Sequence, residues 1–308
     1  MKQIPLVFAV DDNYAPFLSV TLKSILENSS KEFFYKIFVL NSGLSKEHFD
    51  KLSEYNTSNS SIEYVDVAKR LNAISEKLHL RDYYTKTIYY RFFIPALFPQ
   101  YDKALYLDSD LTVLTDISLL FNQDLGDNLV GAIPEEVMTL VKVFGDYSED
   151  GLDIPREEYF NSGIMVMNLK KMREISIEDK FVELLLQHKF EVAPDQDYLN
   201  VICQNKACLL DLGWNKTPME NDNFNNDDLK IIHYKLASKP WHYDNVIYDE
   251  YFWKYAKMTN YYQDILKIKR EYTSSQVEED ESGYAKLQQT AYEYIIDGKN
   301  YKKSKKVR

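Results

Sequence analysis

Two aspartates separated by one residue follow a short apolar run near the middle of the chain. Asp108 and Asp110 come directly after residues 103–107 (KALYL), a pattern typical of a buried strand. Because side chains alternate along a strand, both carboxylates are expected to project together at its carboxyl end. Two such carboxylates repel each other unless a cation lies between them, and Mg²⁺ and Mn²⁺ prefer these ligands and bridge to phosphate. The pattern indicates a metal–phosphate site, although Asp-x-Asp also occurs in ordinary turns.

The residues before this motif alternate between strand and helix patterns. The expected strands cover residues 4–10, 35–40, 62–67 and 103–107. The expected helices cover residues 17–26, the segment that begins at Ser45, and the stretch through 89–93. This alternation predicts a parallel sheet with helices on both faces, in which ligands bind at the carboxyl ends of the strands.

The residues after the motif continue the α/β pattern and then become helical and polar. Further strands are expected at 129–133, 162–168, 206–212 and 229–233, and further helices at 175–188, at 197–204 and from about Trp241 onward. Residues 274–282 are acidic and poor in apolar side chains, so they are predicted to be a loop or linker before a last helix over 284–296. We expect a catalytic domain over residues 1–242 and a helical segment with a basic tail over 243–308.

Composition limits the functions and compartments to be considered. The 308 residues carry a formal net charge of −11, which argues against general nucleic-acid binding but not against a local basic site for a diphosphate. The apolar run at 4–10 is too short for a signal peptide, and Cys203 and Cys208 are expected to be buried free thiols. We therefore expect a cytoplasmic protein whose basic tail, residues 302–308, makes at most a weak peripheral contact with the inner membrane face.

A hydrophobic strand followed by residues 108–112 (DSDLT) fits two classes of enzyme. In phosphohydrolases of the haloacid dehalogenase type, Asp108 would be the nucleophile and Asp110 the general acid. In nucleotide-sugar glycosyltransferases, both carboxylates hold a metal on a diphosphate. Position favours the second class, because the hydrolase motif usually begins its domain and here a long α/β region precedes it. A third hypothesis is a non-catalytic protein that binds a nucleotide sugar.

Several further motifs occur in an order that points to one family. They are FAVDDNY at 8–14, YR at 90–91, LYLDSD at 105–110, YFNSG at 159–163, NLK at 168–170, DQD at 195–197, HY at 233–234 and KPWH at 239–242. This set resembles glycosyltransferase family 8, the retaining enzymes that include glycogenin and bacterial lipopolysaccharide galactosyl- and glucosyltransferases. The resemblance implies a GT-A fold: a Rossmann-like, mostly parallel central sheet flanked by helices, with a small helical region at the C-terminus.

The resemblance also implies an activity and a set of site residues. The expected reaction moves a hexose, glucose or galactose, from a UDP-sugar to a hydroxyl group of an acceptor such as a cell-surface glycan. Asp108, Asp110 and His233 match the family's ligands for Mn²⁺, or for Mg²⁺ in its place, and carboxylates with an imidazole suit Mn²⁺. The residues that match the donor contacts are Ala9, Asp11, Asn13, Tyr14, Arg91, Ser109, Glu135, Asn161, Asp195, Gln196 and Lys239.

Each match implies a physical role. Asp11 is expected to accept a hydrogen bond from the uracil N–H, and Tyr14 to stack on the base. Lys239 is expected to contact the diphosphate, where it offsets the charge that grows as the leaving group departs. One departure from the family pattern concerns Leu236, where the family commonly has a glycine that lets the backbone approach phosphate closely. The loop at 234–239 is therefore expected to hold the diphosphate differently.

Three residues match the catalytic positions around the donor sugar: Arg91, Asp195 and Gln196. The expected reaction breaks the sugar–phosphate bond through an oxocarbenium-like state. The acceptor hydroxyl attacks from the same face, and the departing phosphate oxygen takes its proton. Retention through a covalent intermediate is the alternative, but Gln196 is a poor nucleophile, so we favour the front-face route.

Overall fold

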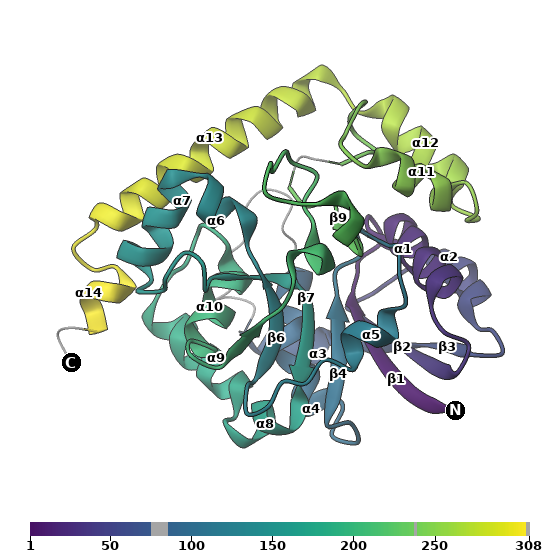
Figure 1. Ribbon diagram of the computed structural model, residues 1–308, viewed down its shortest axis with the longest axis horizontal. Coiled ribbons are helices and arrows are strands. Elements are labelled where there is room, and N and C mark those ends of the chain that lie inside the picture. The colour runs from purple at the N-terminus through teal and green to yellow at the C-terminus, as the bar shows by residue number, and fades with distance from the viewer. Residues whose placement is uncertain (75–85, 237–238, 306–308) are drawn as a thin grey trace.

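A computed structural model describes residues 1–74, 86–236 and 239–305 (Figure 1). Within these residues, seven strands form a central sheet in the order β3-β2-β1-β4-β7-β6-β8. The strands β1, β2, β3 and β4 run parallel to one another, as the alternating pattern predicts, and β7 is antiparallel to both β4 and β6. The sheet is thus mostly parallel in its N-terminal half and mixed beyond β4.

The strands match the apolar runs of the sequence. In the central sheet they are β1 (Lys2–Ala9), β2 (Phe33–Asn41), β3 (Ser60–Asp66), β4 (Lys103–Leu107), β6 (Val130–Pro134), β7 (Phe160–Asn168) and β8 (Ala207–Leu209). A second sheet pairs β5 (Leu111–Val113) with β9 (Ile231–His233) in antiparallel register, so that Leu111 lies opposite His233. The sequence patterns did not predict β5, which is too short to show an alternation.

The helices and turns lie between and around these strands. The α-helices are α1 (Ala15–Asn28), α2 (Lys46–Leu52), α3 (Ala68–Ile74), α4 (Ile94–Leu97), α5 (Ile117–Phe121), α6 (Glu136–Leu140), α7 (Lys142–Asp146), α8 (Leu169–Glu174), α9 (Ile177–Gln187), α10 (Pro194–Ile202), α11 (Asp249–Ala256), α12 (Tyr262–Glu271), α13 (Ser274–Ile296) and α14 (Tyr301–Lys305). The 3₁₀-helices are η1 (Ser53–Tyr55), η3 (Lys86–Phe93), η5 (Leu212–Asn215) and η6 (Asn226–Asp228), and a π-helical turn, η4, covers Tyr147–Gly151.

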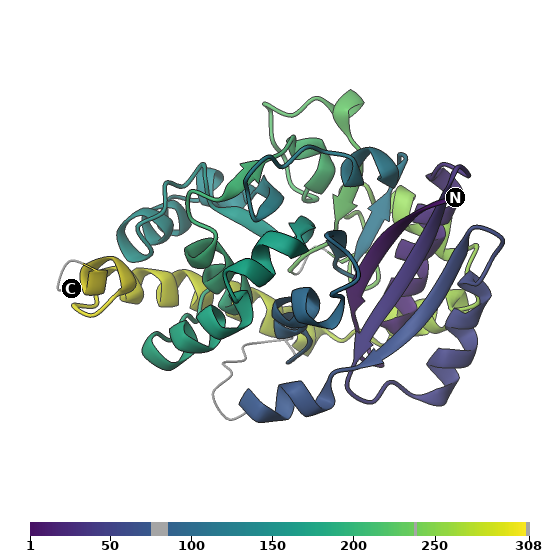
Figure 2. The same ribbon diagram turned by 90° about the horizontal axis from the view of Figure 1, so that it is seen from below.

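Helices cover both faces of the sheet (Figure 2), and a hydrophobic core lies between the sheet and the helices on each face. Alternate residues of β4 belong to different cores: Ala104 and Tyr106 pack with η3, α8, α9 and α10, whereas Leu105 and Leu107 pack with α1, α11 and α12. This alternation is the period of two that a strand imposes on its side chains. Because both faces are covered, the carboxyl ends of β1 and β4 are the part of this sheet that opens onto a cleft.

The C-terminal residues form helices that pack on both halves of the molecule. The helix α11 contacts α1, and α13 contacts α7 and η4, as Figure 1 shows. The prediction of a loop or linker over 274–282 is wrong, because these residues form the first part of α13. A capping box between Thr273 and Gln276 starts that helix, and Asp280 accepts hydrogen bonds from the Tyr243 and Tyr272 hydroxyl groups. The division of the chain after residue 242 stays a prediction.

The structure also bears on the expectations about the two cysteines, membrane-spanning segments and the basic tail. Both cysteines are free thiols, but only Cys203 is buried, and Cys208 is half-buried. In the described residues, every helix is too short or too polar to cross a bilayer. In the basic tail, Lys302 binds Asp150 and Lys305 binds Asp153, while residues 306–308 lie outside the described part.

Candidate active site

A cleft of about 1190 Å³, counting the space open to solvent, lies at the carboxyl ends of β1 and β4. It brings together residues that are far apart in the sequence and that come from both halves of the sheet. The expected site residues that line it are Ala9, Asp11, Tyr14, Arg91, Asp108, Ser109, Asp110, Glu135, Asn161, Asp195, Gln196, His233 and Lys239. Asn13 does not line the cleft and is exposed in the turn before α1.

Asp108 and Asp110 converge, but through a bend rather than along a strand. The strand β4 ends at Leu107, and β5 begins at Leu111, so both aspartates lie in the tight connection between them. The Ser109 hydroxyl group points the other way and donates to the carbonyl oxygen of Ala9 over 3.3 Å. The backbone N–H of Asp108 donates to the Gly163 carbonyl over 2.7 Å, which ties the bend to β7.

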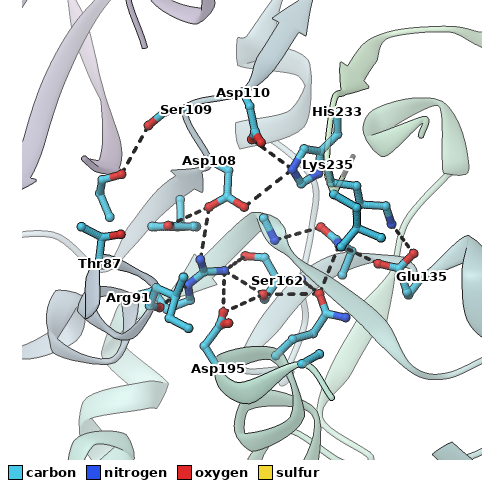
Figure 3. A pocket seen from close by; sticks show the side chains of 18 of the residues that line it. Thr87, Arg91, Asp108, Ser109, Asp110, Glu135, Ser162, Asp195, His233 and Lys235 are labelled. Atoms are coloured by element: carbon cyan, nitrogen blue, oxygen red, sulfur yellow. Dashed lines mark hydrogen bonds and ion pairs between the residues drawn. The ribbon is translucent and has the colours of Figure 1, made fainter. Parts of the chain in front are cut away.

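His233 completes a group of three metal-ligating side chains (Figure 3). It is the last residue of β9, and its Nε2 lies 3.2 Å from Asp110 Oδ1 and 3.7 Å from Asp108 Oδ2. The ligand atoms of the three residues lie within 4.8 Å of one another. Two carboxylates and an imidazole that converge in this way fit a divalent cation such as Mn²⁺.

Lys239 joins the group from the loop that follows β9. Its ammonium lies 2.5 Å from Asp110 Oδ2 and 2.7 Å from the Tyr234 carbonyl oxygen. Burial alone would raise the pKa of Asp110, but Lys239 and His233 together hold that pKa well below its ordinary value. Asp110 is therefore ionised, and it is ready to act as a ligand.

The charges of the cleft favour a divalent cation. The lining residues with a formal negative charge are Asp11, Asp108, Asp110, Glu135 and Asp195, and those with a formal positive charge are Arg91, Lys235 and Lys239. Five carboxylates against three cations leave a formal charge of −2 when His233 is neutral. A single divalent cation balances that charge, and it relieves the repulsion between Asp108 and Asp110.

Arg91 connects Asp108 to the side of the cleft that Ser162 and Asp195 line. Its guanidinium lies 3.2 Å from Asp108 Oδ1 and 3.1 Å from Asp195 Oδ2, and it stacks over the Tyr106 ring at 4.4 Å (Figure 3). It also donates to the carbonyl and hydroxyl oxygens of Ser162, both at 2.7 Å. Burial raises the pKa of Asp195, and Arg91 opposes that rise. Arg91 thus keeps a buried carboxylate, Asp195, and a half-buried one, Asp108, in fixed positions.

The side of the cleft around Asn161 and Gln196 is a network of buried amides and carboxylates. The Gln196 side-chain oxygen accepts from the Ser162 N–H at 3.0 Å and from Asn161 at 3.1 Å. Asn161 also donates to Glu135 at 2.7 Å, and Glu135 forms an ion pair with Lys235. Asp195 and Gln196 lie within the first turn of α10, because that helix begins at Pro194, three residues before the expected start at 197.

Gly163 lies where a side chain would collide with the metal-ligating group. A Cβ atom there would come within 3.0 Å of both His233 Cε1 and Asp108 Oδ2. We expect Gly163→Ala to displace both side chains, to lower the free energy of unfolding by about 1–3 kcal/mol and to reduce Mn²⁺ affinity at least tenfold. Chemical unfolding and a Mn²⁺ titration measure the two effects. Gly298→Ala, where nothing lies within 4 Å, is the control, and equal behaviour of the two variants would contradict the assignment.

Asp197 gives the fold a predictable dependence on pH. Burial raises its pKa to about 7 from an ordinary value of 3.8, and hydrogen bonds from Tyr159, the Ala193 N–H and Tyr147 only partly oppose this. The folded protein therefore holds a proton that the unfolded chain releases between these two pKa values. As the pH rises through this window, the free energy of unfolding should fall by up to roughly 1.4 kcal/mol per pH unit.

The variant Asp197→Asn isolates this contribution, because its amide oxygen still accepts from Tyr147 and the Ala193 N–H, its NH₂ group donates to the Tyr159 hydroxyl oxygen, and the side chain carries no titrating proton. Urea unfolding at several pH values between 4 and 8 should show the wild-type protein losing stability relative to the variant as the pH rises. Parallel curves for the two proteins would show that Asp197 titrates normally.

Several residues that build the cleft were not predicted as site residues. Ser162 and Gly163 lie inside the YFNSG motif, so the sequence contained a signal for them. Lys235 lies in the loop after His233 and pairs with Glu135. The Asn215 side-chain oxygen lies 3.0 Å from His233 Nδ1. Asn215 is the last residue of the short 3₁₀-helix η5, and no pattern in the sequence indicated its role.

Comparison with known proteins identifies the family that this chain matches. The family model "Glycosyl transferase family 8" matches residues 5–245. General stress protein A of Bacillus subtilis is 29% identical over 271 residues, which cover 80% of this chain and 91% of that protein. A lipopolysaccharide 1,2-glucosyltransferase of Escherichia coli is 28% identical over 256 residues, which cover 76% of this chain and 72% of that protein.

Solved structures give the same result at the level of the fold. The galactosyltransferase LgtC, in complex with donor and acceptor sugar analogues, superposes with a TM-score of 0.71 at 26% identity, covering 83% of this chain and 96% of LgtC. The bifunctional glycosyltransferase WbbM superposes with a TM-score of 0.75 at 28% identity, covering 88% of this chain. This chain spans 52% of the length of WbbM. Since the family model matches most of its length, the chain belongs to glycosyltransferase family 8 and has the GT-A fold expected of it.

Proposed function

We propose that this glycosyltransferase is a metal-dependent, retaining enzyme that transfers glucose or galactose from a UDP-sugar to a hydroxyl group of a glycan. The observation that carries the proposal is the convergence of Asp108, Asp110 and His233 beside Lys239 in one cleft. A diphosphate needs cations on more than one side, and a bound divalent metal together with Lys239 would supply them. The resemblance to family members that use UDP-sugars and Mn²⁺ supports the choice of donor and metal.

The metal would be held by Asp108, Asp110 and His233, whose donor set fits Mn²⁺ and also accepts Mg²⁺. When bound there, a divalent cation acts as a Lewis acid on the diphosphate. The ammonium of Lys239 opposes the negative charge that develops on the leaving group. Asp11 and Tyr14 also line the cleft and border the space that we assign to uridine, and the Tyr14 ring lies 5.6 Å from the Lys239 ammonium.

The transferred sugar would lie against Arg91, Asp195 and Gln196. The Gln196 side-chain oxygen is engaged by two donors, Ser162 N–H and Asn161, so it is a poor candidate for a nucleophile. The front-face route needs no nucleophile from the protein, because the acceptor hydroxyl attacks directly and its proton passes to the departing phosphate oxygen. We assign Arg91 and Asp195 to orient the donor sugar and to fix the charge around it.

Leu236 is the feature in which this cleft departs from the family pattern. Its φ is +54°, the left-handed conformation that favours glycine, and it lines the cleft beside Lys235. We expect Leu236→Gly to bind UDP with Mn²⁺ several-fold more tightly, because it opens space beside the diphosphate and lets the backbone approach it closely. The roughly 1–2 kcal/mol of backbone strain that it relieves would instead raise the stability of the fold. Leu236→Ala is the control, since it removes the side chain but keeps the strain. Weaker UDP binding by Leu236→Gly in calorimetry would contradict this role.

We also propose that any membrane contact through the basic tail is weak. Lys302 and Lys305 already bind Asp150 and Asp153, so fewer charges are available to an anionic surface than the sequence suggests. Sedimentation with vesicles that contain anionic lipid tests this, with the chain shortened after Ile296 as the comparison.

The experiment that tests the proposed function is incubation of the purified protein with UDP-glucose and with UDP-galactose, with and without Mn²⁺. We expect slow release of UDP from one of the two donors only when the metal is present. Hydrolysis of phosphomonoesters that is lost in Asp108→Asn would instead support the phosphohydrolase hypothesis. Donor binding without turnover, across a broad panel of acceptors, would support the non-catalytic hypothesis.

A further inference from the structure

A chain of buried side chains connects the donor-sugar side of the cleft to the metal-ligating side. It runs from Glu135 through Asn161 and Asn215 to His233, and each of these four side chains is at most 5% exposed. The links are Asn161 Nδ2 to Glu135 Oε2 at 2.7 Å, Asn215 Nδ2 to Asn161 Oδ1 at 2.8 Å, and His233 Nδ1 to Asn215 Oδ1 at 3.0 Å. Its members come from the N-cap of α6, from β7, from η5 and from β9, which are separate segments of the sequence.

The first link has only one chemically allowed direction. A carboxylate accepts hydrogen bonds and donates none, so Glu135 can only accept from Asn161. Burial alone would raise the pKa of Glu135, but Lys235 and Asn161 hold it below its ordinary value, which keeps this group a carboxylate. The backbone N–H of Gly163 donates to Asn161 Oδ1 at 2.9 Å and independently fixes the same orientation of the Asn161 amide. The oxygen of Asn161 therefore faces Asn215.

The same donor-to-acceptor direction then holds for the other two hydrogen bonds of this series. Because Asn161 presents its oxygen, Asn215 must donate with its NH₂ group, and its own oxygen is left to face His233. An oxygen accepts only, so the His233 Nδ1 must carry a proton. In a neutral imidazole the other nitrogen, Nε2, then has no proton, and it is the nitrogen that points at Asp110 and Asp108.

We propose that Asn161 and Asn215 are positioning residues that hold His233 in the Nδ1–H tautomer, with the lone pair of Nε2 directed at the metal site. The proposal rests on the proposed function, in which Asp108, Asp110 and His233 hold the metal. The opposite tautomer would carry its proton on Nε2 and donate it to Asp110, so that Nε2 could not bind a metal. The observed network excludes that neutral tautomer, and with a neutral imidazole it leaves three lone-pair donors converging on one point, an arrangement that a bound cation stabilises.

The position of Asn215 is itself built into the fold. The next residue, Lys216, pairs with β9: its N–H donates to the Ile231 carbonyl and its carbonyl accepts from the His233 N–H, both at 2.9 Å. The Lys216 ammonium is buried against Glu136 at 3.1 Å, which anchors this segment to the start of α6. Asn215 is thereby held next to His233 by backbone pairing on one side and by a buried ion pair on the other.

The direct test is long-range ¹H–¹⁵N NMR of the histidine rings in the full chain, freed of metal with EDTA. The His233 signals are identified by their absence in His233→Gln. We expect wild-type His233 to carry its proton on Nδ1. In Asn215→Leu, which removes the acceptor, we expect the proton to move to Nε2. In Asn215→Asp, which restores an accepting oxygen, we expect Nδ1 to be protonated again.

A second readout is the affinity for Mn²⁺ alone, measured by electron paramagnetic resonance. We expect Asn215→Leu to bind Mn²⁺ roughly 10–100-fold more weakly, a loss typical of removing the partner that orients a metal-ligating histidine. Asn41→Ala, which removes a buried amide from the carboxyl end of β2 without touching this network, should bind Mn²⁺ like wild type. If Asn215→Leu fails to fold, the wild-type tautomer decides the question alone.

The outcomes separate this inference from the proposed function. A wild-type protein that binds Mn²⁺ and UDP but carries the His233 proton on Nε2 when metal-free would overturn the inference and leave the function standing. A wild-type protein with the Nδ1–H tautomer that binds no divalent metal would overturn the proposed function and leave the tautomer assignment standing.

Discussion

Replacing Asp110 by Asn is expected to lower UDP release from the preferred UDP-sugar about 10³-fold. Asp110 is one of three converging ligands and also holds Lys239, so the variant loses a metal ligand and the carboxylate that pairs with the Lys239 ammonium. The loss corresponds to about 4 kcal/mol of transition-state stabilisation, a size typical of losing metal-assisted charge stabilisation. UDP release is measured with saturating Mn²⁺, and thermal unfolding shows whether the variant keeps its fold.

Asp102→Asn is the matched control for this prediction. Asp102 lies just before the other end of β4, its side chain is 80% exposed, and it pairs with Arg173 at the surface. We expect this variant to turn over at the wild-type rate. If Asp110→Asn also keeps full activity and full dependence on Mn²⁺, the metal assignment is wrong.

Replacing Arg91 by Leu is expected to lower the free energy of unfolding by about 3–5 kcal/mol, because the buried carboxylate of Asp195 and the half-buried carboxylate of Asp108 lose their shared cation. Arg91 is 3% exposed and lies between Asp108 and Asp195, and it also donates to Ser162. Denaturant-induced unfolding, followed by circular dichroism, measures this loss. Turnover should fall in parallel, because the same guanidinium fixes one metal ligand and the donor-sugar side of the cleft.

The matched control here is Arg70→Leu. Arg70 pairs with Glu178 at the surface, with side chains that are 41% and 31% exposed, and exposed ion pairs contribute little to stability. We expect a much smaller loss of stability and no change in turnover. An Arg91→Leu variant as stable as Arg70→Leu would mean that the carboxylates in the cleft do not depend on Arg91.

The sequence predicted the frame of the molecule well, because long apolar runs leave a clear signal. The strands β1, β2, β4 and β7 correspond to continuous buried runs, and such runs mark strands covered on both faces. Short elements were less predictable: β5 has three residues, and the start of α13 depends on a capping box and on a tyrosine pair around Asp280. Tertiary contacts order that polar segment, and composition alone did not reveal them.

Within the site, residue types were predicted more reliably than the geometry that joins them. Asp108, Asp110 and His233 do converge, but through a bend between two strands rather than through alternation along one. Asn215 was missed, because its role depends on Lys216 pairing with β9, and no local pattern encodes that pairing. Leu236 takes the conformation expected of a glycine, a feature that only the backbone dihedral angle reveals.

The account depends most on the claim that the cleft binds a nucleoside diphosphate through a divalent metal. The most direct measurement is a calorimetric titration of UDP into the wild-type protein, once with Mn²⁺ present and once with EDTA in its place. We predict saturable one-to-one binding with Mn²⁺ and a loss of at least tenfold in affinity with EDTA. Equal UDP affinity in both titrations, or no UDP binding in either, would contradict the assignment of Asp108, Asp110 and His233 as a metal–diphosphate site.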